Sequence, residues 1–238
     1  MVVIQARMGS TRLPGKVLAD VAGRPLIMHV VQRAARIVGI SDILVAIPDL
    51  PEDDLLQNAL RQADVRVARG SATDVLDRYI TAIQADDPDG VVRITADCPL
   101  LSPVVSTAVV RAFRTGTCDY ASNTLERSYP RGLDTEVVST KALRTAAAEA
   151  NEQPEREHVT PFVWRRPQRF QLCSVKRGTN LSHMRWTVDT PADLQFVRTV
   201  YEEIGDAEFD EAEVVQLLQA QPAIADINAN VPQKDVGP

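Results

Sequence analysis

Short apolar runs alternate with segments of helical periodicity along the first half of this chain. The runs have the length of buried strands, and the longer segments repeat apolar residues every three or four positions, as amphipathic helices do. The strand candidates are 2–6, 42–47, 65–70 and 90–96, and the helical segments are 24–39, 47–63, 71–85 and 104–116. Because strands that alternate with helices form right-handed βαβ units, the pattern predicts an α/β fold with a mixed, mostly parallel sheet flanked by helices.

The alternation is less regular after about residue 117. Strands are expected at 119–122, 170–176 and 184–189, a loop entering a further strand over 127–139, and helices at 140–150, 190–205 and 210–221. Thr190 before Pro191 is typical of a helix N-cap, and Ser71 or Thr73 is a candidate cap for the helix over 71–85. The chain shows no repeat, low-complexity tract or linker, so we expect a single domain over 1–238.

Charge and composition exclude several classes of protein. The 238 residues carry a formal net charge of −6, which argues against a general nucleic-acid binder and makes any functional positive charge local. No window approaches the roughly 20 apolar residues of a membrane-spanning helix, and no signal-peptide pattern is present, so we expect no membrane partner and cytoplasmic residence. Cys98, Cys118 and Cys173 form no metal-binding or CxxC pattern, so we expect reduced thiols, with neither a disulfide framework nor a zinc site.

The segment ARMGSTRLPGK, residues 6–16, directly follows the first strand and concentrates positive charge. Arg7, Arg12 and Lys16 have no acidic residue between them. Ligands of a parallel sheet bind beyond the carboxyl ends of its strands, which is where this loop begins. Guanidinium groups match phosphate oxygens, and Gly9 and Gly15 allow the backbone to approach a ligand closely. The loop matches neither the GxGxxG fingerprint nor the Walker A pattern, so it indicates either a polyphosphate site or a solvated basic turn.

Two aspartates each follow an expected strand. Asp97, in ITADCPL, follows the strand over 90–96, and Asp189, in RWTVDTPADL, ends the strand over 184–189. Carboxylates at two strand ends suit a Mg²⁺ ion that also binds phosphate oxygens. Taken alone, each aspartate is more often a turn or helix-cap residue than a metal ligand. Asp193 is expected to supply negative charge to the first turn of the following helix.

Two segments of the second half carry candidate substrate-binding residues. In YPRGLDTEV, Arg131 suits a carboxylate or phosphate, and Asp134 and Glu136 share a strand face where they could accept hydrogen bonds from sugar hydroxyls. A charged edge strand is the alternative. Glu157 and His158, in EREHVTP, are candidates for a substrate contact or a general base, although a lone histidine is more often structural.

Residues 2–33, VVIQARMGSTRLPGKVLADVAGRPLIMHVVQR, strongly resemble the N-terminus of the sugar-acid cytidylyltransferases. That family contains CMP-KDO synthetase and the acylneuraminate cytidylyltransferases. Gln5, where KDO synthetases typically have proline, is similar to the spore-coat polysaccharide biosynthesis branch of the same superfamily. The segments ADCPL and DTPADL resemble the family's metal-binding segments, except that Cys98 stands where those enzymes have glutamate. The resemblance implies a GT-A-like nucleotidyltransferase fold. From the organisation of the chain, we expect a nucleotide-binding half over about 1–115 and an acceptor-binding half over about 116–238 within the single domain.

The resemblance also implies roles for individual residues. The nucleotide would be held by Ala6, Arg7, Gly9, Ser10, Thr11, Arg12 and Lys16, with Ser71 and Arg78 near the base and ribose. The catalytic residues would be Arg7, Lys16, Asp97 and Asp189, the two aspartates as Mg²⁺ ligands. By the chemistry of the two segments described above, the expected substrate-binding residues are Arg131, Asp134, Glu136, Glu157 and His158. Because related enzymes are commonly dimers, we expect a homodimer.

The implied reaction is the Mg²⁺-dependent transfer of a cytidylyl group from CTP to an acidic or phosphorylated sugar-like acceptor, with release of pyrophosphate. A GT-A-type glycosyltransferase, or an enzyme that uses another nucleoside triphosphate, is the alternative, although the cationic loop favours triphosphate chemistry. A non-enzymatic nucleotide-binding module would require Asp97 and Asp189 to lie more than about 10 Å apart, too far to share one Mg²⁺ ion.

Overall fold

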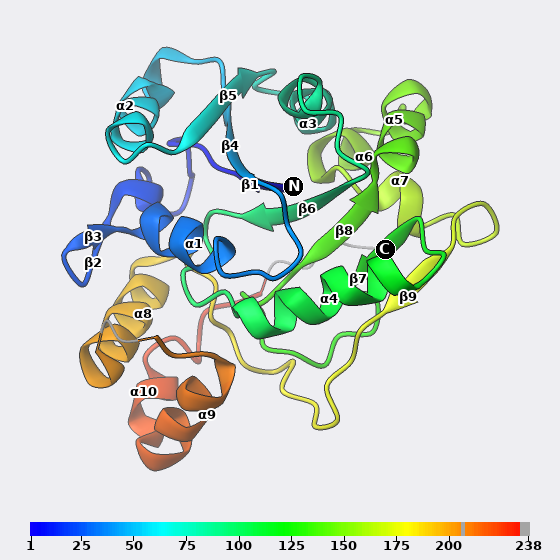
Figure 1. Cartoon of the computed structure of the whole chain (residues 1–238). Coiled ribbons are helices and arrows are strands. Elements are labelled where there is room, and N and C mark those ends of the chain that lie inside the picture. Colours follow the sequence, from blue (N-terminus) through cyan, green and yellow to red (C-terminus); the bar gives the residue numbers. More distant parts are fainter. Residues whose placement is uncertain (206–207, 234–238) are drawn as a thin grey trace.

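A seven-stranded sheet runs through the whole protein (Figure 1). The computed structural model describes residues 1–205 and 208–233. The strand order is β5-β4-β1-β6-β8-β7-β9. The strands are β1 (Val2–Gln5), β4 (Ile43–Pro48), β5 (Arg66–Gly70), β6 (Gly90–Thr95), β7 (Tyr120–Ser122), β8 (Glu136–Ser139) and β9 (Leu172–Ser174). Strands β5, β4, β1 and β6 are parallel, β8 is antiparallel to β6 and β7, and β7 is parallel to β9. The predicted mixed, mostly parallel sheet is confirmed.

Helices cover both faces of this sheet. They are α1 (Leu26–Ala34), α2 (Asp54–Gln62), α3 (Val75–Ile83), α4 (Pro103–Thr115), α5 (Thr140–Glu149), α6 (Gln153–His158), α7 (Pro161–Trp164), α8 (Pro191–Ile204), α9 (Glu211–Ala220) and α10 (Pro222–Asp226). Two short 3₁₀ turns, η1 (Lys16–Leu18) and η2 (Pro51–Asp53), and a small antiparallel pair, β2 (Asp20–Val21) with β3 (Arg24–Pro25), complete the described elements. No helix of the described residues is long and apolar enough to cross a bilayer.

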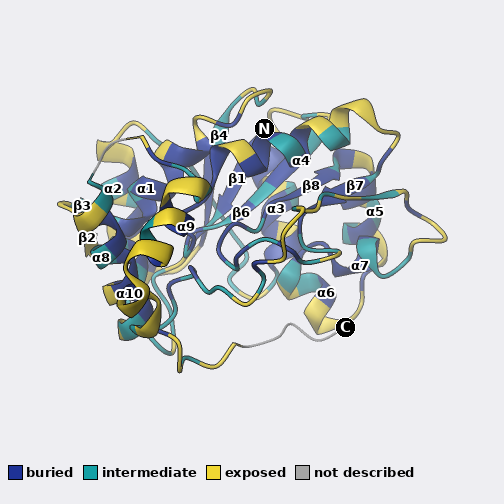
Figure 2. Cartoon of the chain, turned by 90° about the horizontal axis from the view of Figure 1, so that it is seen from below, coloured by how far each residue is buried: buried dark blue, intermediate teal, exposed yellow. Residues whose placement is uncertain are grey.

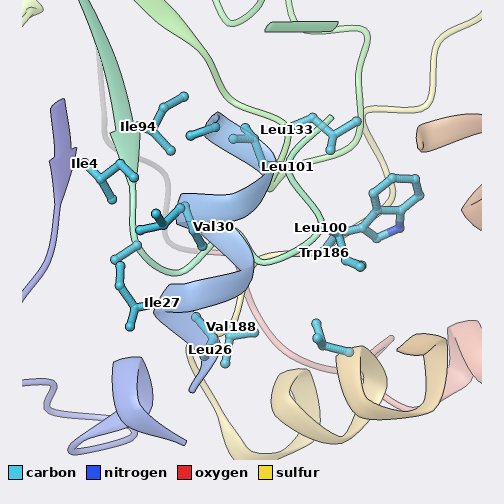
Figure 3. Close-up of a cluster of buried hydrophobic side chains, with 14 of the residues drawn as sticks. Ile4, Leu26, Ile27, Val30, Ile94, Leu100, Leu101, Leu133, Trp186 and Val188 are labelled. Carbon is cyan, nitrogen blue, oxygen red and sulfur yellow. The ribbon is translucent and has the colours of Figure 1, made fainter. Parts of the chain in front are cut away.

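The strands alternate their side chains between two hydrophobic cores. Ile4 of β1 packs in the core that α1, α4, α8 and α9 cover, whereas the neighbouring Val3 packs in the core beneath α3, α5 and α7. This period of two is what a strand buried on both faces requires. Figure 2 shows the resulting layers, with the buried strands between helices that expose only their outer faces. Figure 3 shows the first core, where Val30 of α1 lies among Ile4, Ile94 and Leu101.

Helix starts are correctly predicted in one case and wrongly in another. Thr190 caps α8 and forms a reciprocal capping box with Asp193, which confirms the prediction from Thr190 and Pro191. The cap of α3 is Asp74, whose side chain accepts a hydrogen bond from the backbone of Asp77, and not Ser71 or Thr73. The hydroxyl of Ser71 instead accepts a hydrogen bond from the backbone N–H of Asp74 at 3.0 Å, one turn before the helix.

The segment 184–189 is extended but is not the predicted strand. Its backbone bonds to two loops and, among the described residues, forms only an isolated bridge with Arg131. The N–H of Trp186 donates to Arg131 at 2.7 Å, and the N–H of Val188 donates to Asp97 at 2.8 Å. Gly132 permits this close approach, because its φ of +106° favours glycine and a Cβ there would lie 2.8 Å from the carbonyl carbon of Trp186. Tertiary contacts therefore place Asp189 beside Asp97 without a strand.

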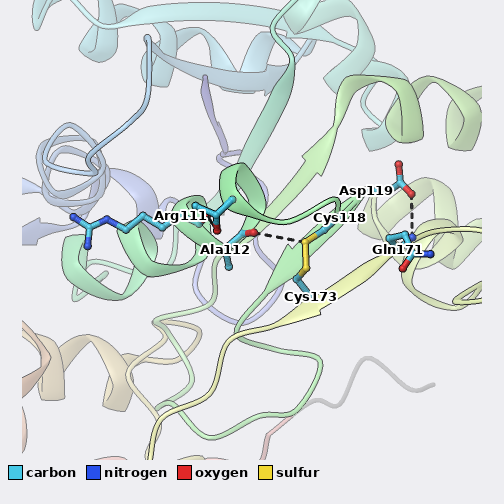
Figure 4. The surroundings of a disulfide bond; sticks show 7 residues. Arg111, Ala112, Cys118, Asp119, Gln171 and Cys173 are labelled. Carbon is cyan, nitrogen blue, oxygen red and sulfur yellow. Dashed lines mark hydrogen bonds between the residues drawn. A yellow bond between two sulfur atoms is a disulfide. The ribbon is translucent and has the colours of Figure 1, made fainter.

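The prediction of reduced cysteines is wrong for two of the three. Cys118 and Cys173 form a disulfide (Figure 4), although 55 positions separate them in the sequence, and Cys98 is free and buried. Cys118 lies just before β7 and Cys173 lies in β9, and these two strands are parallel neighbours. Cysteine spacing did not reveal the bond because the pairing of β7 with β9 brings the two residues together.

Candidate active site

The cationic loop follows the carboxyl end of β1, and backbone hydrogen bonds fix its conformation. The backbone N–H of Met8 donates to the buried carboxylate of Asp53 at 2.7 Å, and the N–H of Gly15 donates to the carbonyl of Met8 at 3.0 Å. Gly15 has a φ of +70°, the left-handed conformation that glycine adopts without strain, and it is the N-cap of η1. The Arg7 side chain is exposed at the rim of this loop. The loop is therefore ordered before any ligand arrives.

Lys16 lies at the centre of the site. Its ammonium donates to Asp97 at 3.1 Å, to Asp189 at 2.9 Å and to the carbonyl of Val188 at 2.6 Å. Burial works against the charge of Lys16, but the two carboxylates outweigh burial and raise the pKa of the ammonium above its ordinary value. In the free protein this side chain thus binds the two aspartates that were expected to hold a metal.

Asp97 and Asp189 converge. Because one oxygen of each lies about 3 Å from the same ammonium nitrogen, these two oxygens are at most about 6 Å apart. The hydroxyl of Thr95 donates to the other oxygen of Asp97 at 2.6 Å. Two guanidinium groups, from Arg12 and Arg185, each lie 2.9 Å from the other oxygen of Asp189. Although burial opposes ionisation, these cations together with Lys16 hold the pKa of Asp189 below its ordinary value.

The donor set fits a hard divalent cation that brings ligands of its own. Within residues 1–205 and 208–233, no three or more His, Cys, Asp or Glu side chains gather as a complete metal site. Mg²⁺ is commonly held by one or two carboxylates together with substrate phosphates and water, which is what Asp97 and Asp189 offer. Burial raises the pKa of the Cys98 thiol well above its ordinary value, so this side chain stays a neutral thiol and adds no negative charge beside Asp97.

A buried carboxylate that sequence reasoning undervalued positions Asp189. Asp193 is completely buried and accepts hydrogen bonds from the backbone N–H groups of Asp189 and Thr190 at 3.0 Å and 2.9 Å. It also receives the guanidinium of Arg185 at 2.9 Å and the side-chain amide of Asn228 at 3.0 Å. The Thr-x-x-Asp pattern in the sequence predicts that Asp193 takes part in the helix cap. No local pattern predicts its contacts with Arg185 and Asn228.

A cavity of about 500 Å³ lies beside Thr95, and neither Asp97 nor Asp189 is among its lining residues. Four of the five expected substrate residues line it, namely Arg131, Asp134, Glu136 and His158, whereas Glu157 does not. Sequence reasoning missed the other lining residues: Gln5, Arg93, Thr95, Tyr120, Thr124, Leu125, Arg127, Thr160, Pro161, Trp164 and Gln233. The shared Thr95 links the cavity to Asp97.

Glu136 is bound by the protein itself. One of its oxygens accepts the hydroxyls of Tyr120, at 2.6 Å, and of Thr160, while the other pairs with the guanidinium of Arg93. Burial opposes its charge, yet Arg93 and these hydroxyls hold the pKa of Glu136 below its ordinary value. In the cavity wall, Glu136 is a buried anion whose oxygens already accept hydrogen bonds from neighbouring residues. This geometry does not support the expectation that it accepts sugar hydroxyls.

Asp134 and Arg78 are not freely exposed side chains: Asp134 forms an ion pair, and Arg78 is buried. Asp134 forms a bidentate pair with Arg127 at 2.6 Å and 2.9 Å. Arg78 is buried, Nε and Nη1 of its guanidinium have no hydrogen-bond partner in the described residues, and it packs against Gly70. Burial, with the charge of Arg7, lowers the pKa of Arg78. Neither Ser71 nor Arg78 lines the cavity.

An α/β sheet whose carboxyl edge carries a cationic loop and two converging carboxylates is suited to bind a nucleoside triphosphate together with a divalent cation. The model of the family described as cytidylyltransferase matches residues 1–224. The chain therefore belongs to the cytidylyltransferase family and is a nucleotidyltransferase enzyme, as the opening segment predicted. This membership, with the closeness of Asp97 to Asp189, also makes the non-enzymatic reading wrong.

The chain is similar to two curated proteins and one solved structure in particular. The chain is 32% identical to the spore coat polysaccharide biosynthesis protein SpsF of Bacillus subtilis, over 94% of this chain and 95% of that protein. It is 41% identical to a 3-deoxy-manno-octulosonate cytidylyltransferase of Anaeromyxobacter dehalogenans, over 48% of this chain and 47% of that one. A solved cytidylyltransferase from Leptospira borgpetersenii superposes with a TM-score of 0.91, at 26% identity over 98% of both chains.

Proposed function

We propose that this protein transfers the cytidylyl group of CTP to an acidic or phosphorylated sugar-like acceptor, with Mg²⁺ as cofactor and pyrophosphate as the second product. One observation carries the proposal: Asp97 and Asp189 converge beside the cationic loop at one edge of the sheet. Triphosphate chemistry requires anion recognition and charge neutralisation at one place. The name of the Anaeromyxobacter relative, a cytidylyltransferase of a sugar acid, supports CTP and a sugar acid as the two substrates.

Two kinds of group in the loop would bind the oxygens of the triphosphate, namely charged side chains and backbone N–H donors. Arg7 and Arg12 supply guanidinium groups for phosphate oxygens, and the backbone from Ala6 through Thr11, including Gly9 and Ser10, supplies N–H donors. Bound Mg²⁺, held by Asp97 and Asp189, would neutralise negative charge on the reacting phosphates. Lys16, released from the two carboxylates, would then face the phosphates. Ser71 and Arg78, behind the loop, are proposed to shape the side of the site that receives the base and ribose.

The acceptor is proposed to occupy the cavity. Arg127 and Arg93 pair with Asp134 and Glu136, and Arg131 also lines the cavity. A guanidinium in that position suits one carboxylate or phosphate of the acceptor. An acceptor oxygen attacks the α-phosphorus, and pyrophosphate leaves in line. Glu157, outside the cavity wall, is proposed to act only through its neighbour His158.

A matrix of the four ribonucleoside triphosphates against sugar acids and sugar phosphates, with pyrophosphate as readout, tests the proposal. We expect pyrophosphate only when CTP, an anionic acceptor and Mg²⁺ are all present, and a loss of product when Asp97 or Asp189 is changed to asparagine. Release of UDP or GDP from a sugar nucleotide, with no pyrophosphate from any triphosphate, would show that the protein is instead a glycosyltransferase. Light scattering on the purified protein tests the expected homodimer.

A further inference from the structure

The chain has three histidines, and one of them lines the cavity. His29 is buried and a nitrogen of its ring contacts the carbonyl of Val21 at 2.8 Å, so it belongs to the core. His183 lies in a loop outside the lining of the cavity. His158, the last residue of α6, is the one whose side chain borders the space in which an acceptor is proposed to bind.

The backbone beside His158 is strained. Val159 is completely buried and has a φ of +73° and a ψ of −52°, a conformation that a β-branched residue rarely adopts. The N–H of Thr160 donates to the carbonyl of His158 at 2.8 Å, which closes a tight γ-turn around Val159. The hydroxyl of Thr160 donates to the buried carboxylate of Glu136. Strain of this kind persists where the surrounding structure enforces it, commonly at functional sites.

The imidazole of His158 is available to a ligand. Neither ring nitrogen has a hydrogen-bond partner among residues 1–205 and 208–233. Neither is among the buried atoms that lack a partner, so both nitrogens are accessible. Burial lowers the pKa of His158 below its ordinary value; Arg93 of β6 and Arg165 after α7 act in the same direction, and Glu157 of α6 and Glu136 of β8 oppose them. The other charged side chains of the cavity are Arg127, Arg131 and Asp134. The ring is therefore neutral at neutral pH.

The cavity connects this ring to the reaction centre. Thr95 lines the cavity and donates to Asp97 at 2.6 Å, so one lining residue of the cavity contacts a carboxylate of the reaction centre. His158 and Thr160 belong to another wall, on the α6–α7 side of the sheet. An acceptor that fills the cavity would therefore contact residues of both walls, Thr95 on one side and His158 on the other.

We propose that His158 is the general base of the transfer. Its free ring nitrogen takes the proton of the attacking acceptor hydroxyl while that oxygen forms a bond to the α-phosphorus of CTP. The bond from the α-phosphorus to the bridging oxygen breaks, the electron pair leaves with pyrophosphate, and the imidazolium returns its proton to solvent. This inference rests on the proposed function, because it requires triphosphate cleavage at Asp97 and Asp189.

Kinetics of H158Q and H158A, with H183Q as the matched control, test the inference. The assay follows pyrophosphate with CTP, Mg²⁺ and the best acceptor of the matrix, or with water as the acceptor if none reacts faster. We expect kcat of both His158 variants to fall about 100-fold or more, with the KM for CTP unchanged and H183Q equal to wild type. The fall of wild-type kcat at acid pH, as His158 is protonated, should be absent from H158Q. Added imidazole should restore part of the activity of H158A, which a purely structural role would not allow.

Two outcomes overturn the inference separately from the proposed function. If the wild type is active and H158Q keeps both its kcat and its loss of activity at acid pH, another group, or solvent, takes the proton. Loss of activity in H158A that imidazole does not restore, with a lowered melting temperature, shows a structural histidine. A wild type that forms no pyrophosphate from CTP with any acceptor or water overturns the proposed function, and this inference with it.

Discussion

Replacing Lys16 by methionine removes one positive charge from the centre of the site and nearly preserves the length of the side chain. The variant leaves Asp97 and Asp189 facing each other without the ammonium that now binds both. Removing one partner of a buried ion pair costs about 3–5 kcal/mol of unfolding free energy. The two carboxylate side chains retain 25% and 20% of their exposure, so water screens part of that loss. We expect about 2 kcal/mol, which for a chain of this size lowers Tm by about 6 °C.

Mg²⁺ without nucleotide should then separate the variant from the wild type. In K16M the two carboxylates are open to a divalent ion, and Mg²⁺ at ten times its Kd restores about 1.4 kcal/mol. In the wild type the ammonium of Lys16 already lies between them, so Mg²⁺ alone should leave Tm unchanged. Differential scanning fluorimetry at constant ionic strength measures both, and K176M, which removes an exposed lysine paired with Glu126, is the control. An equal Mg²⁺ shift in wild type and K16M would refute the reasoning.

Three further perturbations have defined outcomes. C118S/C173S should lose about 4 kcal/mol of unfolding free energy in urea relative to the oxidised wild type, because the disulfide closes a 55-residue separation, and a reductant should remove the difference. G132A should lose about 2–3 kcal/mol in the same assay, since its φ of +106° and the adjacent backbone of Trp186 both oppose a side chain; stability equal to wild type would contradict this. The folded pKa of Glu136 lies below its unfolded value, so its contribution is present above about pH 4.5 and is lost as the pH falls through the folded pKa. Urea unfolding at a series of acidic pH values should show this loss in the wild type, and E136Q should be less stable near neutrality but with a flatter dependence on pH.

Local patterns predicted the parts of the molecule that local physics determines. The strand over 2–6, the loop that leaves it and the cap at Thr190 each depend on neighbours a few residues away, and each was predicted correctly. The convergence of Asp97 and Asp189 was also anticipated, because both residues were expected at strand ends and therefore at one edge of a sheet. The second of these strands does not form, yet the extended backbone before Asp189 still delivers it there.

The features that escaped prediction all depend on contacts distant in sequence. The disulfide follows from the pairing of β7 with β9, and the saturation of Glu136 follows from Arg93, Tyr120 and Thr160, which lie on other elements. Charge pattern alone could therefore not distinguish Glu136, held by the protein, from a carboxylate that awaits a ligand. In the same way, the contacts of Lys16 could not be predicted from its neighbours in sequence, because Asp97 and Asp189 lie far from it along the chain.

The hydrogen bonds of Asp193 make the catalytic edge depend on a remote stretch of chain. Asn228 donates to Asp193 and to the carbonyl of Arg185, and so connects the segment after α10 to the loop that carries Asp189. A recombinant fragment cut after α10 would keep all seven strands of the sheet and the complete opening loop, and it would look intact by circular dichroism. Such a fragment would lack one of the supports of Asp189, so inactivity of a shortened protein is no evidence about its substrate. Protein engineers who trim or fuse the C-terminal side should leave residues through at least Asn228 in place.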